Sequence, residues 1–119
     1  GAHRASVAAV RTGAADIAAI DAVTFALLRR YAPAETDGLR VLGWSAEAPA
    51  LPYAARREVG ADTRARMTAA LLNAVGDPDA AAARTALLLS AMTPIDDDAY
   101  APIPEMRRTA ERLGYPELA

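Results

Sequence analysis

The chain has 119 residues and a mass of 12.4 kDa, the size of one modest domain. It contains no cysteine, which excludes disulfides, zinc–thiolate sites and thiol catalysis. Thirteen basic residues against fifteen acidic ones give a formal charge of −2, so a nucleic-acid-binding surface is not expected. Hydrophobic residues make up 53% of the chain, but many are alanine, and the longest apolar stretches are too short to span a bilayer.

The first 44 residues predict an alternation of helices and strands. Ser6–Gly13 is expected to be a short helix, with Ser6 as its N-cap and Gly13 just after its end. The apolar residues 16–20 predict a buried strand that ends at Asp21. A helix over 22–31, stopped by Pro33, and a second strand over 39–44 follow. Strand, helix and strand in this order predict a right-handed crossover in an α/β sheet, parallel for the most part.

The rest of the chain is predicted to be helical after a proline-containing connection. Residues 45–52 have no helical period and read as a linker or hinge, and 51–56 read as a short strand restricted by Pro52. Asp62 is expected to cap the first of the later helices. These helices are expected over residues 62–75 and 79–91, and from Pro102 or Pro104 to Leu113, with the last one closed by Gly114 and Pro116.

Known catalytic and metal-binding patterns are missing from the sequence. The only histidine, His3, has no second histidine or cysteine with which to form a zinc site, and no serine-nucleophile or phosphate-loop signature occurs. Residues 96–98 are three aspartates, but they lack the spacing of a calcium loop and predict a solvated turn. We therefore expect no enzyme activity, metal or cofactor; an alternative with Asp21 as base and His3 as acid lacks a nucleophile.

Two positions could hold a small anion. Ser6 at a helix start would offer a hydroxyl and free backbone N–H groups, with His3 in the same turn. Asp21 would lie at the carboxyl end of a strand, where ligands bind in open α/β sheets. Each position has a structural alternative: Ser6 as a simple cap, Asp21 as the N-cap of the next helix, and His3 as an exposed terminal residue.

The order of several segments resembles the second half of a phosphate/phosphite/phosphonate-type periplasmic solute-binding protein of an ABC transporter, a type II binding protein. The segments that carry the resemblance are Gly1-Ala2-His3-Arg4-Ala5-Ser6, Gly13 to Asp21, Leu39 to Trp44, Leu51-Pro52, Asp98 to Ile103 and Gly114-Tyr115-Pro116. The resemblance extends over essentially the whole chain. It implies part of a two-lobed α/β protein that closes on its ligand around a hinge, without catalysis.

In residue terms, the resemblance implies a ligand held by His3, Ser6 and Asp21. It implies that residues 1–46 belong to the second lobe, that 47–56 form the hinge, and that 57–119 are C-terminal helices packing on a first lobe that has no counterpart here. The implied setting is the periplasm, with permease subunits as partners. The chain opens with Gly-Ala-His, so any signal peptide is expected upstream or removed.

The ligand chemistry is left open between two alternatives. A phosphonate or phosphate near the carboxylate of Asp21 must present either a protonated oxygen or, in an aminophosphonate, an ammonium group. A chain with one lobe is expected to bind such ligands weakly or not at all. The alternative function is a truncated relative or fragment that acts as a structural or interaction domain and forms a homodimer through its exposed lobe surface.

Overall fold

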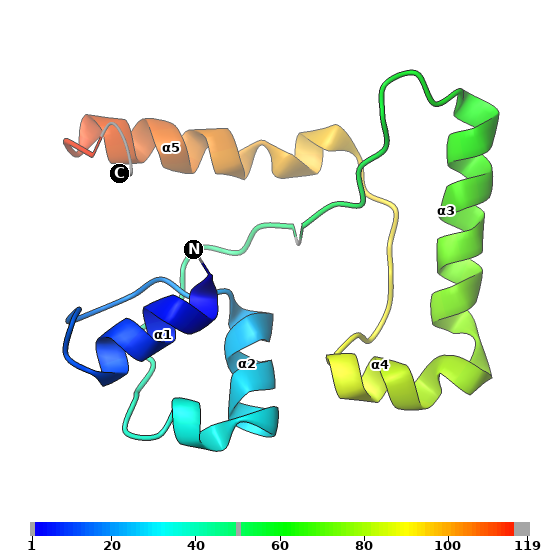
Figure 1. Cartoon of the computed structure of the whole chain (residues 1–119). Helices are drawn as coiled ribbons and strands as arrows, with labels where there is room; N and C mark the ends of the chain where they lie inside the picture. Colours follow the sequence, from blue (N-terminus) through cyan, green and yellow to red (C-terminus); the bar gives the residue numbers. More distant parts are fainter. Residues whose placement is uncertain (1, 50, 116–119) are drawn as a thin grey trace. The chain divides into compact units, whose positions relative to one another are not determined.

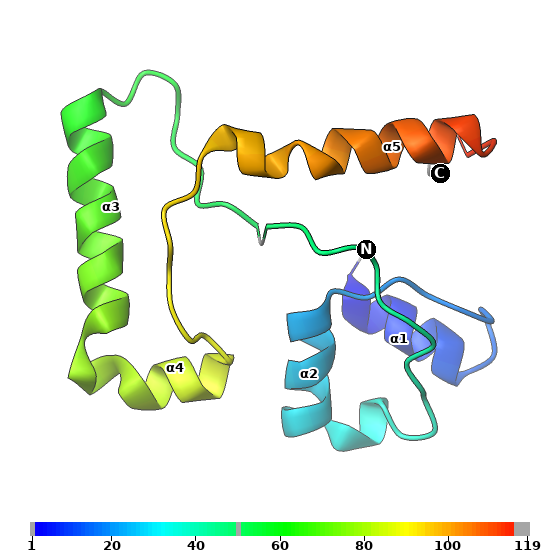
Figure 2. The same cartoon turned by 180° about the vertical axis from the view of Figure 1, so that it is seen from behind.

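The computed structural model describes residues 2–49 and 51–115, and Figures 1 and 2 show the chain from two sides. Within these ranges every regular element is a helix. The α-helices are α1 (His3–Arg11), α2 (Ala22–Tyr31), α3 (Ala61–Gly76), α4 (Ala81–Leu87) and α5 (Pro102–Arg112). The 3₁₀-helices are η1 (Pro33–Glu35), η2 (Pro78–Ala80) and η3 (Asp97–Tyr100). None of the described helices is long and apolar enough to cross a bilayer.

The predicted α/β fold with a parallel sheet is wrong. In the described part of the chain, residues 16–20, 39–44 and 51–56 form no strand. A helix satisfies its backbone groups within one segment, whereas a strand needs a second strand beside it. The apolar runs have strand-like composition, but no described segment pairs with them.

The ends of α1 and α2 agree with the sequence-based predictions except for the start of α1. Helix α2 begins and ends as predicted, and Gly13 follows α1 with φ of 77°, which lets the Ala14 N–H donate to the carbonyl of Ala9. The predicted N-cap at Ser6 is wrong, because α1 begins at His3 and Ala2 is the N-cap, without a side-chain hydrogen bond. Ser6 therefore lies inside the helix.

The later helices lie near their predicted positions, but the N-cap of α3 and the length of α4 differ from the prediction. The predicted cap at Asp62 is wrong, since Gly60 is the N-cap of α3 and makes no side-chain bond. Helix α4 is shorter than expected: it ends at Leu87, and the C-cap residue Leu88 has φ of 57°. Helix α5 lies where it was predicted, and Gly114 follows it with φ of 86°. Pro116, the expected stop beyond it, lies outside the described residues.

The chain divides into two compact units, of which the first is Gly1–Trp44 with Asp79–Ser90. In this unit α1, α2 and η1 pack against one another. The core is small: among the described residues, Val7 of α1 is the only buried hydrophobic side chain, with 2% of its surface exposed. The packing of α1 on α2 and η1 therefore depends heavily on this one residue.

Helix α4 is attached to the end of α2 by side-chain hydrogen bonds. Arg30 Nη1 donates to the Thr85 carbonyl at 2.7 Å, and the Tyr31 hydroxyl donates to the Ala86 carbonyl at 2.8 Å. The guanidinium of Arg30 also lies 5.3 Å from the centre of the Tyr31 ring. Carbonyls in the last turn of a helix lack partners within it, so these donors from α2 act as a cap for α4.

Removing the Tyr31 hydroxyl should loosen this attachment. We expect Tyr31→Phe to lower the free energy of unfolding of the first unit by about 1 kcal/mol, the usual value of one hydrogen bond. Urea unfolding followed by circular dichroism measures the change. Tyr53→Phe is the matched control, because Tyr53 is 75% exposed and makes no hydrogen bond to a described residue. Equal effects of the two substitutions would contradict the capping role.

The second unit comprises Ser45–Pro78 and Ala91–Ala119. Helix α5 contacts η3 and carries ion pairs along its own surface. Glu105 binds Arg108 at 2.7 Å and Arg112 at 3.1 Å, and Arg107 binds Glu111 at 3.0 Å. All these groups are solvent-exposed, so each pair contributes little to stability.

Candidate ligand-binding site

The three residues expected to bind ligand come from the first turns of α1 and the start of α2. His3 and Ser6 belong to α1, and Asp21 is the N-cap of α2. Because His3 and Ser6 are three residues apart in a helix, their side chains lie on the same face of α1. The structure thus gives each of the three a defined place at or near a helix start, where unpaired backbone N–H groups favour anions.

Asp21 is held as a helix cap. Its Oδ1 accepts a hydrogen bond from the Thr24 backbone N–H at 2.7 Å. Hydrogen bonds from the backbone and side chain of Thr24 lower the pKa of Asp21. Asp21 is exposed, and its carboxylate is ionised at neutral pH. The capping alternative for Asp21 is therefore confirmed.

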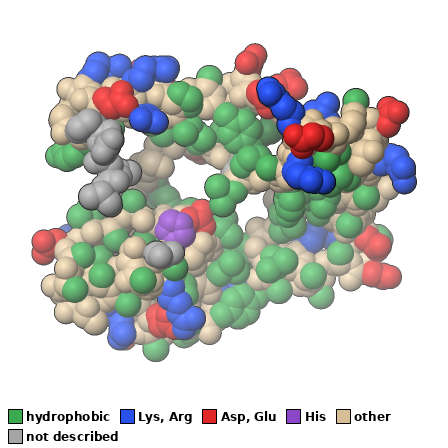
Figure 3. Space-filling model, turned by 45° about the horizontal axis from the view of Figure 1, so that its top comes forward, with side chains coloured by type: hydrophobic (Ala, Val, Ile, Leu, Met, Phe, Trp, Pro, Cys, Tyr) green, Lys and Arg blue, Asp and Glu red, His purple; other side chains and the backbone are tan. Residues whose placement is uncertain are grey.

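A hydrogen bond brings His3 next to Asp21. The backbone N–H of Asp21 donates to Nδ1 of His3, with 3.4 Å between the two nitrogens. A neutral imidazole that accepts at Nδ1 carries its proton at Nε2, so we assign that tautomer from the geometry. His3 is exposed, and Figure 3 shows the imidazole at the molecular surface. Its Nε2–H is therefore available as a donor to a ligand oxygen.

The Ser6 hydroxyl and the first amides of α1 complete the group of donors. Ser6 is half-buried, and its hydroxyl makes no hydrogen bond to a described residue. Its backbone N–H donates to the Ala2 carbonyl at 3.2 Å. Because the N-cap Ala2 has no polar side chain, the N–H groups of His3 and Arg4 have no side-chain cap. These are the donors that an oxyanion at the start of α1 would use.

Sequence analysis did not predict the ion pair beside these donors. Arg4 Nε donates to Glu35 Oε2 at 2.6 Å, and the second guanidinium nitrogen binds Oε1, so the pair joins α1 to η1 through two bonds. Hydrogen bonding to Arg4 lowers the pKa of Glu35 and raises that of Arg4. The two residues are 31 positions apart, and no local pattern in the sequence links them.

The Arg4–Glu35 pair predicts acid sensitivity. Since the pKa of Glu35 is lower in the folded chain than its ordinary value of about 4.3, the contribution of the pair is fully present above that pH and is lost as pH falls through the folded value. The pKa of Asp21 is also lower in the folded chain than its ordinary value. We expect Glu35→Gln to reduce the slope of unfolding midpoint against pH below about pH 4.3. Glu47→Gln should leave the slope unchanged, because the carboxylate of Glu47 forms no hydrogen bond or ion pair with a described residue. Equal slopes in both variants would contradict the role of the pair.

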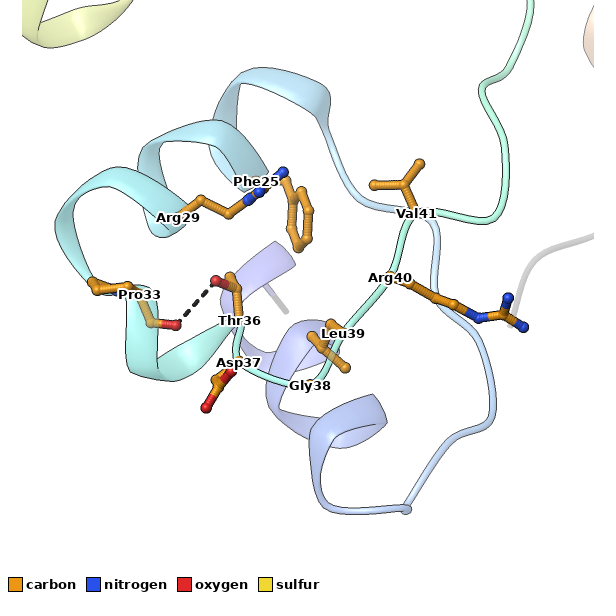
Figure 4. Close-up of a pocket in the computed structure, with 9 residues that line it drawn as sticks. All are labelled: Phe25, Arg29, Pro33, Thr36, Asp37, Gly38, Leu39, Arg40 and Val41. Atoms are coloured by element: carbon orange, nitrogen blue, oxygen red, sulfur yellow. Dashed lines mark hydrogen bonds between the residues drawn. The ribbon is translucent and has the colours of Figure 1, made fainter.

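An open cavity of about 510 Å³ lies along α2 and the segment that follows it (Figure 4). Its lining begins at Phe25, about one helical turn after Asp21, and includes none of His3, Ser6 and Asp21. Figure 4 shows the Arg40 guanidinium pointing away from the other lining side chains, so Arg29 and Arg40 do not converge on one ligand. The lining residues are Phe25, Arg29, Pro33, Thr36, Asp37, Gly38, Leu39, Arg40 and Val41.

Comparison with known proteins adds one finding to this geometry. Residues 1–100 match the model of a protein family described as ABC transporter, phosphonate, periplasmic substrate-binding protein. No curated protein and no solved structure gave a significant match. The matched region includes His3, Ser6 and Asp21 and covers most of the chain. Members of this family bind a substrate for transport and are not enzymes. The chain therefore belongs to the family of phosphonate-binding periplasmic proteins of ABC transporters.

Proposed function

We propose that the chain is a solute-binding component of an importer for a phosphonate or a related small oxyanion such as phosphate or phosphite, and that His3, Ser6 and Asp21 contact the ligand. The observation that carries the proposal is the hydrogen bond between His3 and Asp21. It brings the starts of α1 and α2 together, so the donors of one helix and the carboxylate of the other face the same ligand. Family membership supplies the ligand class.

The donors of α1 suit the anionic end of such a ligand. The Nε2–H of His3, the hydroxyl of Ser6 and the first backbone amides of α1 would donate to phosphonate oxygens. None of them carries a full positive charge when His3 is neutral, and Arg4 is bound to Glu35. The anion is thus held by hydrogen bonds and by the positive end of the α1 dipole.

Asp21 constrains which ligand fits. Two like charges about 4 Å apart repel by about 1 kcal/mol in water and about 4 kcal/mol near a protein surface, so a fully deprotonated phosphonate beside Asp21 is disfavoured. One lone pair of the carboxylate is already bound to Thr24. The remaining lone pairs can accept from an ammonium group of an aminophosphonate or from a protonated phosphonate oxygen. Both alternatives belong to the proposal.

We also propose that the chain supplies one lobe of the binding protein. On this proposal residues 1–46 belong to the second lobe, 47–56 to the hinge, and 57–119 to helices that pack on the first lobe. The small core supports it, because large apolar side chains are exposed in both units, including Ile17 at 68% and Leu113 at 71%. The proposed setting is the periplasm, where permease subunits respond when the lobes close on the ligand.

A second candidate function is a self-associating interaction domain. The same exposed side chains favour it, since a second copy or another partner would remove their apolar surface from water. Figure 3 shows apolar side chains over much of the visible surface. This alternative does not require a ligand, so binding measurements distinguish it from the transport function.

Binding of small phosphonates by the 119-residue chain tests the proposal. Line broadening in ³¹P NMR detects weak binding of methylphosphonate, 2-aminoethylphosphonate and phosphate. We expect dissociation constants of about 1 mM or weaker, because half of the contacts are missing. Ser6→Ala should weaken binding by about threefold to tenfold. Ser45→Ala is the control: Ser45 lies in the connection after residue 44, outside the proposed site, and its loss should leave binding unchanged. Nanomolar affinity would contradict the one-lobe proposal, and no binding at about 50 mM ligand would contradict the site.

A further inference from the structure

Residues 40–44 are a largely apolar stretch of the first unit without a hydrogen-bonding partner among the described residues. They follow the turn closed by the bond from Leu39 N–H to the Thr36 carbonyl, and they adopt no secondary structure. Neither their backbone nor their side chains form a hydrogen bond or ion pair with a described residue. Three of the five side chains are large and apolar, with exposed fractions of 46% for Val41, 62% for Leu42 and 75% for Trp44.

The composition of this stretch favours a β-strand, and its unpaired N–H and C=O groups are a template for pairing with another chain. Side chains alternate between the two faces of a strand, which places Arg40, Leu42 and Trp44 on one face. Figure 4 shows the Arg40 guanidinium directed away from the cavity residues around it. This orientation leaves Arg40 free to contact a partner.

The order of these side chains is self-complementary. In an antiparallel pair of two copies centred on Leu42, Arg40 of each copy lies opposite Trp44 of the other, and Leu42 lies opposite Leu42. Arginine over a tryptophan ring is the most favourable kind of cation–π contact, and it would form twice. No residue within 40–44 then faces a like charge. The apolar segment Leu51–Tyr53 cannot pair as well, because Pro52 has no N–H to donate.

We propose that two copies of the chain associate through residues 40–44 in an antiparallel β-ladder centred on Leu42. The proposal names the surface of the homodimer and requires no ligand, so it stands or fails independently of phosphonate binding. The partner is a second copy of this chain, because the ladder depends on Arg40 and Trp44 being present on both strands. A different protein bound to residues 40–44 would not require a register centred on Leu42.

Sedimentation equilibrium measures the association directly. The wild-type chain should dimerise, and the fluorescence of Trp44, the only tryptophan, should shift to shorter wavelength as concentration rises. Leu42→Lys places two positive charges opposite each other and should weaken the dimer by about tenfold or more. Leu51→Lys is the matched control, because Leu51 is 93% exposed and lies off the ladder. A wild-type chain that stays monomeric, or equal effects of both substitutions, would overturn the proposal.

Cross-linking tests the register, because the chain has no cysteine of its own. Under mild oxidation in air, Leu42→Cys should form a disulfide-linked dimer about tenfold faster than Leu51→Cys, since only residue 42 meets its own copy at short range. A mixture of the Arg40→Cys and Trp44→Cys variants should form mixed dimers faster than either variant forms its own. Cross-linking at Leu51→Cys as fast as at Leu42→Cys would contradict the ladder.

Discussion

An aspartate in place of Val7 is expected to abolish the packing of α1 against α2 and η1. Val7 is the only described hydrophobic side chain that is buried, with 2% exposure, so the substitution places a charge in the one dry position of the first unit. A buried, unpaired charge costs several kcal/mol, which is comparable with the stability of a whole small domain. Loss of the cooperative urea transition of this unit, followed by circular dichroism, is the expected result.

A second substitution of the same kind serves as the control for Val7→Asp. Val23 lies in the first turn of α2 and is 49% exposed. Val23→Asp adds a negative charge near a helix N-terminus, where it is tolerated or slightly stabilising. Val7→Ala should cost less than Val7→Asp, since it removes only two methyl groups from the core. If Val7→Asp unfolds at the same urea concentration as the wild type, α1 is not held by this side chain.

Two substitutions at Asp21 should separate its structural role from its proposed role in binding. Asparagine is as good an N-cap as aspartate, so Asp21→Asn should keep the bond from the Thr24 N–H and the stability of α2. Asp21→Ala removes the cap and should destabilise α2 by about 1 kcal/mol. Thermal unfolding compares the two variants. Equal loss of stability in both would contradict the cap.

The same pair of variants distinguishes the two ligand alternatives. If Asp21 accepts from an ammonium group, Asp21→Asn should weaken binding of 2-aminoethylphosphonate by about tenfold and leave methylphosphonate unchanged or better bound. If it accepts from a protonated oxygen, binding of methylphosphonate to the wild type should fall as pH rises above about 7, where that oxygen loses its proton. Unchanged affinity for both ligands in Asp21→Asn at all pH values would remove Asp21 from the site.

The helices could be predicted from the sequence because their signals are local. Helix α2 was predicted to the residue by its apolar spacing and by Pro33 after its end, and Gly13 and Gly114 were identified by their position after α1 and α5. The start of α1 was missed, because Ser6 is a strong N-cap type and Ala2, the residue used, is a weak one. A preference for caps cannot by itself place a helix start.

The sheet was predicted wrongly because strand composition says nothing about a partner. Residues 16–20 and 39–44 are apolar enough for strands, yet in the described chain neither has a neighbour with which to form a ladder. The ion pair between Arg4 of α1 and Glu35 of η1 could not be predicted from the sequence either, since the two residues meet only when the chain folds back. Local reasoning singled out His3, Ser6 and Asp21 but left each open between ligand binding and a structural role. The family resemblance favoured binding, and that role stays a prediction.

The imidazole resonance of His3 tests the central claim most directly, because it is the only histidine in the chain and its signal needs no assignment. In a titration with methylphosphonate, we predict a saturable shift of this resonance that follows the ³¹P broadening of the ligand and is weakened in Ser6→Ala. A ligand that binds by ³¹P broadening while the His3 signal stays in place would show that phosphonates are held elsewhere on the molecule.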